Sequence, residues 1–413
     1  MSQRIVITGM GTINPCGNSV SEFWNSLKNG KSGIDFVQSF DTSDMPTKIG
    51  GEVKGVDYSL FLDEKEVNRT DRYILHAIAA SEEAVRDANL LDSSVDPERV
   101  GVLVSSGVGG LSYLESEAVK LHEKGPRRVS AFFIPMMIAD MAAGMVSMKY
   151  GFKGPNYGIV SACASGAHAI GDAMIALKAG MMDACVCGGT EAAITRLGFA
   201  GFCAMKAMST RNENPQKASS PFDLNRDGFV MGEGAGVVVL ETLEHAKKRG
   251  AKIYAEIVGY GATGDAYHLS SPAPEGEGAQ RAMKIALSSG GLKTTDIDYI
   301  SAHGTSTPAN DKNETFAIKA VFGDHAEKIS ISSIKSMTGH LLGAAGGIAF
   351  VGMVKSLTED IAPPTINYET PDPLCHLDYT PNVAKARTIN AAICNLFGFG
   401  GHNVSLAIKK FKE

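Results

Sequence analysis

The strongest constraint on the fold is that two halves of the chain share one order of elements. An apolar run at 4–9 ends in glycine, apolar residues at helical spacing cover 72–90, and a second apolar run at 99–105 closes on glycines. The same order of strand, helix and strand returns later, at 253–261, 278–289 and 297–304. Strands that alternate with helices predict mixed sheets covered by helices. We therefore expect an internally duplicated α/β fold.

Each half continues with a helical run rich in glycine and alanine and ends in paired strands. The helical runs at 164–179 and 340–357 carry almost no charge, which indicates burial on all sides. Antiparallel strand pairs are expected at 183–189 with 234–241 and within 391–410. Two such copies around shared central helices predict a five-layered α/β/α/β/α sandwich with mixed sheets.

The boundary between the halves is predicted near Gly250, in a charged segment. The N-terminal half is then 1–250 and the C-terminal half 251–413. The N-terminal half contains extra material, expected to form cap and interface elements, at about 112–150 and 192–230.

The stretch around Cys163 predicts a nucleophile at the start of a helix. The apolar residues 157–160 predict a buried strand that runs into a sharp turn at Cys163, and a helix follows at 164–179. Free N–H groups at a helix N-terminus stabilise a thiolate and lower the pKa of the thiol. Small neighbouring residues leave room for a substrate. Free cysteines are more often buried structural residues, so this stretch alone leaves that alternative open.

Two histidines in the C-terminal half complete a candidate site. His303 lies where a predicted strand ends, and His340 lies in the turn before the second glycine-rich helix. The repeat makes the 335–340 turn the counterpart of the Cys163 turn. Strand ends on one side of a sheet converge, so the thiol and both imidazoles are expected to share a pocket. A lone histidine is more often structural, but two at matching strand ends favour a functional site.

Composition excludes several classes of protein. The 413-residue chain has a net charge of −6, which argues against a nucleic-acid binder. Its seven cysteines have no regular spacing and predict reduced thiols in a cytoplasmic protein. The chain enters a strand without a signal-length apolar stretch, and the apolar region at 341–354 is too short and glycine-rich to span a membrane. Cys185 and Cys187 are expected to be core residues, and we expect no metal site.

Several motifs together carry a family resemblance. The stretches VSACASGAHAIGDAM, AHGTSTPANDKNE, SSIKSMTGHLLGAAGG and NLFGFGGHN, with RDGFVMGEGAG and STRNENPQKASSPFD, resemble the β-ketoacyl-acyl-carrier-protein synthases of types I and II. The region GAKIYAEIVGYGATGDAYH is most similar to type II, the elongating synthase of bacterial fatty acid synthesis. The resemblance covers essentially the whole chain. It implies a thiolase-like fold, a homodimer, no cofactor, and decarboxylative condensation of an acyl chain with malonyl-acyl carrier protein.

The resemblance also implies roles for the candidate residues. Cys163 would carry the acyl chain, and His303 and His340 would donate hydrogen bonds to the enolate oxygen formed on decarboxylation. Backbone N–H groups of Cys163 and Phe399 would form the oxyanion hole for the acyl thioester. Lys335, paired with Glu314, would hold the charge balance of the site without acting as a base.

Further positions are implied for substrate and partner binding. The substrate positions are Val108, Phe133, Ile134, Ser270, Thr305, Thr307 and Phe399, with Phe133 and Ile134 expected to reach across the dimer. Acyl carrier protein is acidic, so its docking site should be basic, and the matching residues are Lys65, Arg69, Arg127, Arg128 and Lys206. Three positions depart from the family pattern. Position 68, which is often basic in relatives, is Asn68 here, Ser270 replaces a threonine, and His402 stands where threonine is usual. His402 is expected to titrate near neutral pH or to alter the hydrogen bonding behind His303 and His340.

Other functions remain open at this stage. The condensing subunit of a polyketide synthase shares every motif. A thiolase or a coenzyme A-type initiating synthase has the same fold, but the initiating synthase uses Cys-His-Asn, and His340 argues against it. A non-catalytic chain-length partner would lack Cys163, and a cysteine hydrolase would need one histidine as a base.

Overall fold

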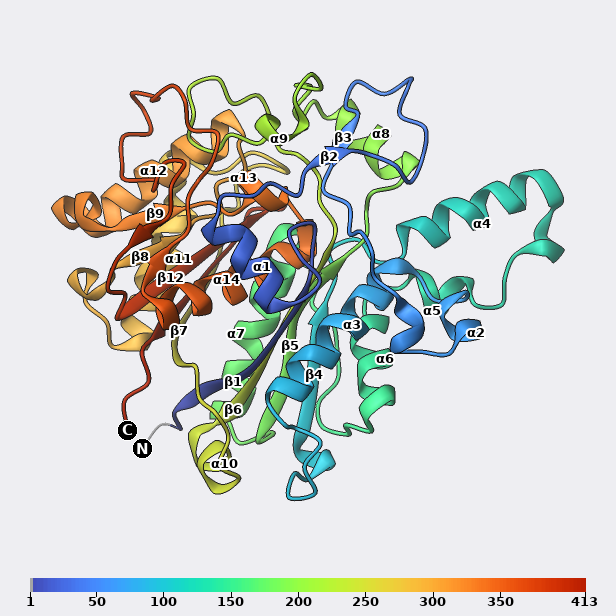
Figure 1. Ribbon diagram of the computed structural model, residues 1–413, viewed down its shortest axis with the longest axis horizontal. Helices are drawn as coiled ribbons and strands as arrows, with labels where there is room; N and C mark the ends of the chain where they lie inside the picture. The colour runs from blue at the N-terminus through green and yellow to red at the C-terminus, as the bar shows by residue number, and fades with distance from the viewer. Residues whose placement is uncertain (1–2) are drawn as a thin grey trace.

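The computed structural model describes residues 3–413. The fold is organised around one large mixed sheet (Figure 1). Its strand order is β4-β5-β6-β1-β7-β13-β12-β8-β9. The nine strands are β1 (Ile5–Ile13), β4 (Val100–Ser105), β5 (Ala184–Glu191), β6 (Gly234–Thr242), β7 (Ala255–Gly264), β8 (Tyr299–Ser301), β9 (Ser330–Ser332), β12 (Ala391–Gly398) and β13 (His402–Lys409). Two small sheets pair β2 (Asp35–Phe36) with β3 (Ile49–Gly50) and β10 (Ile361–Ala362) with β11 (Lys385–Ala386).

The predicted duplication is confirmed by the strand pairing. In the first half β4 pairs parallel with β5, and β5–β6 and β6–β1 are antiparallel. In the second half β8 pairs parallel with β12, and β12–β13 and β13–β7 are antiparallel. The halves meet where β1 pairs with β7 over only three residue pairs, from Ile5↔Ile257 to Ile7↔Ala255. The two predicted sheets are therefore continuous at this seam. The boundary near Gly250 stays a prediction.

Within residues 3–413 no strand of the first half corresponds to β9, and the buried strand predicted at 157–160 is wrong. The chain makes a single parallel bridge there, Val102↔Asn156, and then leaves the sheet. Tyr157 is 40% exposed and Val160 61% exposed. Tyr157 and Val160 therefore lie on the surface beside edge strand β4, whereas Ile159 is partly buried and packs against the core.

Helices cover the outer faces of the sheet, and two helices lie in a central layer between its two halves. They are α1 (Val20–Lys28), α2 (Glu64–Val67), α3 (Arg72–Asp87), α4 (Leu111–Lys124), α5 (Phe133–Met137), α6 (Met141–Tyr150), α7 (Ser165–Lys178), α8 (Arg196–Ala204), α9 (Pro215–Ala218), α10 (Leu243–Lys248), α11 (Glu277–Gly290), α12 (Pro308–Phe322), α13 (Lys335–Thr338) and α14 (Ala345–Glu359). Helix α3 packs on the first half and α11 on the second. Helices α7 and α14 pack on each other and on strands of both halves, near the middle of Figure 1. The layers therefore follow the predicted order, α/β/α/β/α.

The central helices approach closely because small residues line their contact. A β-carbon on Gly346 of α14 would lie 2.4 Å from the backbone nitrogen of Ala167 on α7. A β-carbon on Gly166 would lie 2.9 Å from the carbonyl oxygen of Gly343. Backbone therefore contacts backbone at the N-terminal ends of both helices. This contact brings the Cys163 turn and the His340 turn together.

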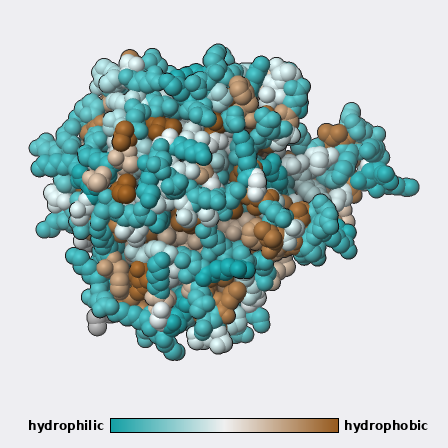
Figure 2. All heavy atoms as spheres, in the orientation of Figure 1, coloured by the Kyte–Doolittle hydropathy of each residue, from teal (hydrophilic) through white to brown (hydrophobic). Residues whose placement is uncertain are grey.

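The two insertions form peripheral helices. The first contains α4, α5 and α6, and α4 projects from the body of the molecule in Figure 1. The second contains α8 and α9. Figure 2 shows that the face in this view is largely hydrophilic, with apolar residues in small scattered groups. No helix within residues 3–413 has both the length and the apolar character needed to cross a membrane.

The close contact of the central helices makes Gly346 sensitive to substitution. We expect Gly346→Ala to lower the free energy of unfolding by about 1–3 kcal/mol, because the new methyl group meets backbone that cannot move aside. The matched control is Gly201→Ala in α8, where a β-carbon has nothing within 4 Å. That change should be neutral or stabilising by up to about 1 kcal/mol, since alanine favours a helix. Thermal unfolding midpoints of the two variants test this, and equal midpoints would contradict the packing argument.

Candidate active site

Cys163 lies in a tight turn that ends directly at the start of α7. The turn is a 3₁₀ segment, Ala162–Ala164, and Ala162 takes the positive φ of 51°. An equivalent 3₁₀ turn, Leu342–Ala344, precedes α14, and Leu342 has a φ of 47°. The counterpart of Cys163 is therefore Gly343. The predicted correspondence with the 335–340 segment is wrong, because that segment forms α13 and a loop before the turn.

The thiol and both candidate imidazoles lie together between the halves. Nε2 of His340 is 3.0 Å from Sγ of Cys163. The His303 and His340 rings have centroids 5.5 Å apart and are perpendicular. Both imidazoles are buried, and Phe229 and Phe397 pack against them. His303 follows the end of β8, and His340 follows α13.

These residues line a cavity of about 380 Å³. The predicted site residues that line it are Cys163, His303, His340, Phe399, Thr305, Thr307, Ser270 and Lys206. Val108, Phe133 and Ile134 are not among its lining residues. Val108 is 42% exposed and Ile134 55% exposed, so these two predicted substrate positions lie at the surface of this chain.

Burial favours the neutral forms of the thiol and of both imidazoles. Burial raises the pKa of Cys163 to about 12, although the charge of Lys335 and the N–H groups of Phe399 and Cys163 act to lower it. The prediction that the helix terminus gives a low thiol pKa is therefore wrong, because desolvation is the larger effect. Burial, followed by the charge of Lys335, holds the pKa values of His303 and His340 well below the usual range. Within residues 3–413 neither Nδ1 has a hydrogen-bond partner, so no contact at Nδ1 fixes the tautomer of either ring.

Lys335 and Glu314 lie near the imidazoles but do not form the predicted direct pair. Both are buried, and residues 3–413 contain no ion pair between them within 4.0 Å. The carboxylate of Glu314 is occupied by the backbone N–H groups of His303 and Gly304, both at 2.8 Å. Burial raises the pKa of Glu314 to about 7, and Lys335 acts on it only at longer range. Glu314 therefore holds the backbone of the His303 loop.

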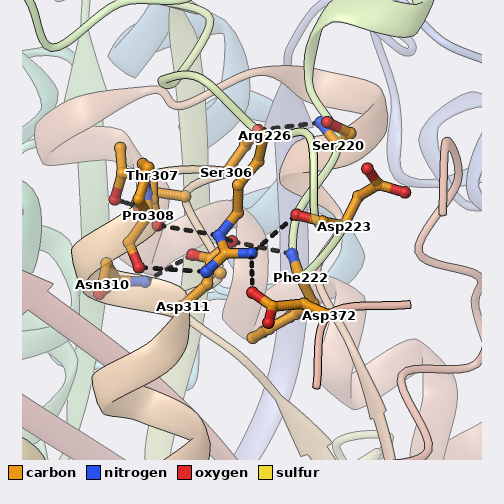
Figure 3. Close-up of polar contacts among 12 residues, drawn as sticks. Ser220, Phe222, Asp223, Arg226, Ser306, Thr307, Pro308, Asn310, Asp311 and Asp372 are labelled. Atoms are coloured by element: carbon orange, nitrogen blue, oxygen red, sulfur yellow. Dashed lines mark hydrogen bonds and ion pairs between the residues drawn. The ribbon is translucent and has the colours of Figure 1, made fainter. Parts of the chain in front are cut away.

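A buried arginine, whose role the sequence did not indicate, holds the loop that carries Thr307 and Pro308 (Figure 3). The guanidinium of Arg226 donates to the carbonyl oxygens of Thr307 at 3.3 Å and Pro308 at 3.1 Å. It also donates to the carboxylate of Asp372 at 2.6 Å. The hydroxyls of Thr305 and Thr307 are 2.8 Å apart in the cavity wall.

Other predicted positions lie at the surface or to one side of the site. The predicted docking residues Lys65, Arg69, Arg127, Arg128 and Lys206 are exposed. The guanidinium of Arg69 lies 5.2 Å from the ring centroid of Phe132, beside α5. The His402 ring contacts His168, with centroids 6.2 Å apart, and lies against Gly400. His402 therefore borders the Phe399 loop and not the far side of His303 or His340. Residues 3–413 contain no group of three or more His, Cys, Asp or Glu arranged to hold a metal.

Comparison with known proteins identifies the family. The model of the β-ketoacyl synthase N-terminal domain matches residues 2–246, and that of the β-ketoacyl synthase C-terminal domain matches residues 254–369. The chain belongs to the β-ketoacyl synthase family. A family member from Synechocystis sp., 3-oxoacyl-[acyl-carrier-protein] synthase 2, is 52% identical over 410 residues, covering 99% of each chain. The protein of the same name from Coxiella burnetii is 50% identical over 408 residues, again covering 99% of each chain.

Solved structures agree with this assignment. A type II polyketide ketosynthase, solved in complex with its acyl-carrier protein, has a TM-score of 0.93, 36% identity and full coverage of both chains. A β-ketoacyl synthase from Burkholderia phymatum has a TM-score of 0.93 and 34% identity, covering 99% of this chain and 100% of its own. The chain therefore has the thiolase-like fold and is a condensing enzyme of the acyltransferase class.

The raised pKa of Cys163 predicts how alkylation of the thiol depends on pH. Only the thiolate reacts, so a pKa raised to about 12 leaves the thiol protonated at pH 7. We expect the iodoacetamide rate at Cys163 to rise about tenfold per pH unit between about pH 7 and pH 9. Mass spectrometry of the labelled peptide measures this rate in a Cys203→Ser background, which removes a partly exposed thiol. A rate that levels off below pH 8 would instead indicate a thiolate stabilised at the helix terminus.

Proposed function

We propose that this enzyme catalyses decarboxylative condensation of an acyl chain carried on Cys163 with malonyl-acyl carrier protein. The observation that carries the proposal is the contact of 3.0 Å between Sγ of Cys163 and Nε2 of His340, with His303 beside it in one cavity. One thiol can hold one acyl group, and two neutral imidazoles can donate to one oxygen. Relatives named 3-oxoacyl-[acyl-carrier-protein] synthase 2 are about 50% identical, and the polyketide ketosynthase is 36% identical. This difference favours a role in fatty acid elongation.

The first step transfers the acyl chain to the enzyme. Sγ of Cys163 attacks the thioester carbonyl of the acyl donor and loses its proton, while the Nε2–H of His340, 3.0 Å away, would donate to the sulfur. The backbone N–H groups of Cys163 and Phe399 face the sulfur and would bind the carbonyl oxygen as it becomes negative. The carrier thiolate then leaves and takes up the proton that Cys163 released. Cys163 holds the chain as a thioester, and both imidazoles keep their Nε2–H groups for the second step.

The second step uses the two imidazoles as donors. The thioester oxygen of the malonyl group would lie between the Nε2 atoms of His303 and His340 as CO2 departs, so the enolate charge forms at two N–H donors. Each such donor is worth about 2.7–4 kcal/mol of barrier in a dry site. The carbanion attacks the acyl carbonyl, a carbon–carbon bond forms, and the Cys163 thiolate leaves and is reprotonated by water. The charge of Lys335 helps to keep both imidazoles neutral, which is a supporting role.

The substrate arm and the carrier protein would bind on the open side of the cavity. The hydroxyls of Thr305 and Thr307, with Ser270, lie in its wall and suit the amides of a pantetheine arm. Lys206 borders the same cavity and is exposed. Together with the exposed predicted docking residues Lys65, Arg69, Arg127 and Arg128, it would offer cations to an acidic carrier protein.

A homodimer would cover an apolar surface beside edge strand β4. Exposed apolar residues lie on three adjacent segments, the 107–110 turn, α5 with the residues after it, and 156–160. They are Val108, Ile134, Ile138, Tyr157 and Val160. A second copy seated there would bring Phe133 and Ile134 of the partner towards the acyl end of the site. Chain-length selection would then depend on both copies.

Replacing Cys163 with glutamine separates the two steps. We expect Cys163→Gln to lose condensation by about a thousandfold or more, because no acyl-enzyme forms. Malonyl decarboxylation should persist or increase, since the amide resembles an acylated cysteine and both imidazoles remain. Product analysis with acyl- and malonyl-acyl carrier protein measures both reactions. His303→Ala is the complementary variant and should lose decarboxylation while Cys163 still accepts an acyl group. Acyl-chain elongation by Cys163→Gln would rule out covalent catalysis at this position.

The proposed dimer predicts the effect of a charge at Val160. A carboxylate at this 61% exposed position would be buried on dimerisation without a partner, so Val160→Asp should shift the protein towards monomer. The matched control is Val383→Asp, at a 74% exposed position away from this surface. Light scattering coupled to size exclusion gives the masses at micromolar concentration. Equal masses for the two variants would place the interface elsewhere.

A further inference from the structure

Glu191, the last residue of β5, is a buried carboxylate that the proposed mechanism does not use. Its side chain is fully buried, and no cation lies within 4.0 Å of it in the described part of the chain. It accepts hydrogen bonds from the Ser106 hydroxyl at 2.7 Å and from the backbone N–H groups of Gly107 at 2.9 Å and Val108 at 3.3 Å. A fourth bond comes from the backbone N–H of Gly343 at 3.0 Å. The donors come from two chain segments, one in each half of the molecule.

The two turns that precede the central helices differ in what their N–H groups face. Cys163 and Gly343 occupy equivalent places, each one residue after a positive-φ residue. The N–H of Cys163 faces its own sulfur beside the open cavity, whereas the N–H of Gly343 binds the carboxylate of Glu191. A β-carbon on Gly343 would lie 2.7 Å from that carboxylate and 2.2 Å from the nitrogen of Gly107. The second turn therefore has no room for a side chain.

The strand ends that meet the two turns also correspond. Glu191 ends β5 and contacts the Gly343 turn of the other half. Gly398 ends β12, and a β-carbon there would lie 2.7 Å from the carbonyl oxygen of Ser161 and 3.2 Å from the nitrogen of Cys163. In each half, one strand end therefore packs against the turn of the other half. At the Cys163 turn that strand end has no side chain, and at the Gly343 turn it carries a carboxylate.

We propose that Glu191 is a positioning residue whose carboxylate fills the anion hole of the duplicated turn and so fixes the active-site geometry. The carboxylate ties the Gly107–Val108 turn, which contacts the carbonyl of Ala162 beside the nucleophile, to the residues that follow His340. Without this acceptor, the backbone N–H groups of Gly107, Val108 and Gly343 would lose their partner and the two segments would separate. His340 Nε2 would then lose its 3.0 Å approach to Sγ of Cys163.

The charge of Glu191 is consistent with this role. Burial raises the pKa of the carboxyl group to about 7, while the hydroxyl and the three N–H donors act to lower it. Above pH 7 the group is therefore mainly an anion held by neutral donors, as a substrate oxyanion would be held at the Cys163 turn. Measurements at pH 8 examine the ionised form.

Three substitutions separate the acceptor from the volume of the side chain. Glu191→Gln keeps an oxygen for the N–H groups of Gly107 and Gly343 and can donate to Ser106. Glu191→Met fills similar space without an acceptor, and Glu191→Ala leaves a hole that formate or acetate can enter. At pH 8 we expect the glutamine variant to keep its condensation rate within about threefold of the wild type and the methionine variant to fall about tenfold or more. Formate or acetate at about 50 mM should raise the condensation rate of the alanine variant at least threefold.

The control is Glu241→Ala, which also removes a buried carboxylate but one bound to Arg249 and His245. Added formate or acetate should not accelerate this variant. The iodoacetamide rate at Cys163 is compared between the glutamine and methionine variants, because both lack the charge of Glu191 that acts to raise the pKa of the thiol. A difference between them therefore reports the geometry at the thiol, whether or not the proposed condensation is correct. Equal rates for the glutamine and methionine variants would overturn the proposal, even if the alanine variant does not fold. Equal acceleration of both alanine variants by carboxylates would also overturn it.

Discussion

The site exists because two helices meet backbone to backbone in the centre of the molecule. Helices α7 and α14 cross where glycine and alanine replace larger residues, so their preceding turns lie against each other. One turn carries Cys163, and the other follows His340 directly. The loop of His303, at the end of β8, then lies beside both. Each half contributes one part of the chemistry, and neither half contains a complete site.

Close packing also determines the electrostatics of the site. A thiol, two imidazoles, an ammonium group and two carboxyl groups are buried in a small volume, and desolvation is the largest effect on each pKa. Burial opposes every charged form, so the imidazoles are neutral donors and the thiol is neutral before substrate arrives. Backbone N–H groups stabilise the carboxylates in place of cations. This arrangement suits a reaction in which negative charge develops on the substrate and not on the resting enzyme.

Much of the fold was predictable from the sequence, because the duplicated order of elements constrains it strongly. Apart from the strand at 157–160, the helices and strands at the predicted ranges are present, and the charge-free helices lie in the middle layer. The failures have physical causes. Tyr157 and Val160 are apolar but exposed, since apolar composition does not distinguish a core strand from a surface that another molecule could cover. The thiol pKa was predicted with the wrong sign, because the sequence shows the helix terminus but not the degree of burial. Arg226 and Glu191 were missed because their partners Asp372 and Gly343 lie 146 and 152 residues further along the chain.

The narrow seam between β1 and β7 bears on how the two halves diverged. Three residue pairs join the sheets, so cohesion depends on the central helices, which are arranged like the interface of a twofold-symmetric dimer. In a true dimer every substitution appears twice, and a carboxylate that filled one turn would fill the other as well. Covalent fusion of the copies removes that restriction. One turn can then keep its reactive thiol while its twin becomes an internal brace.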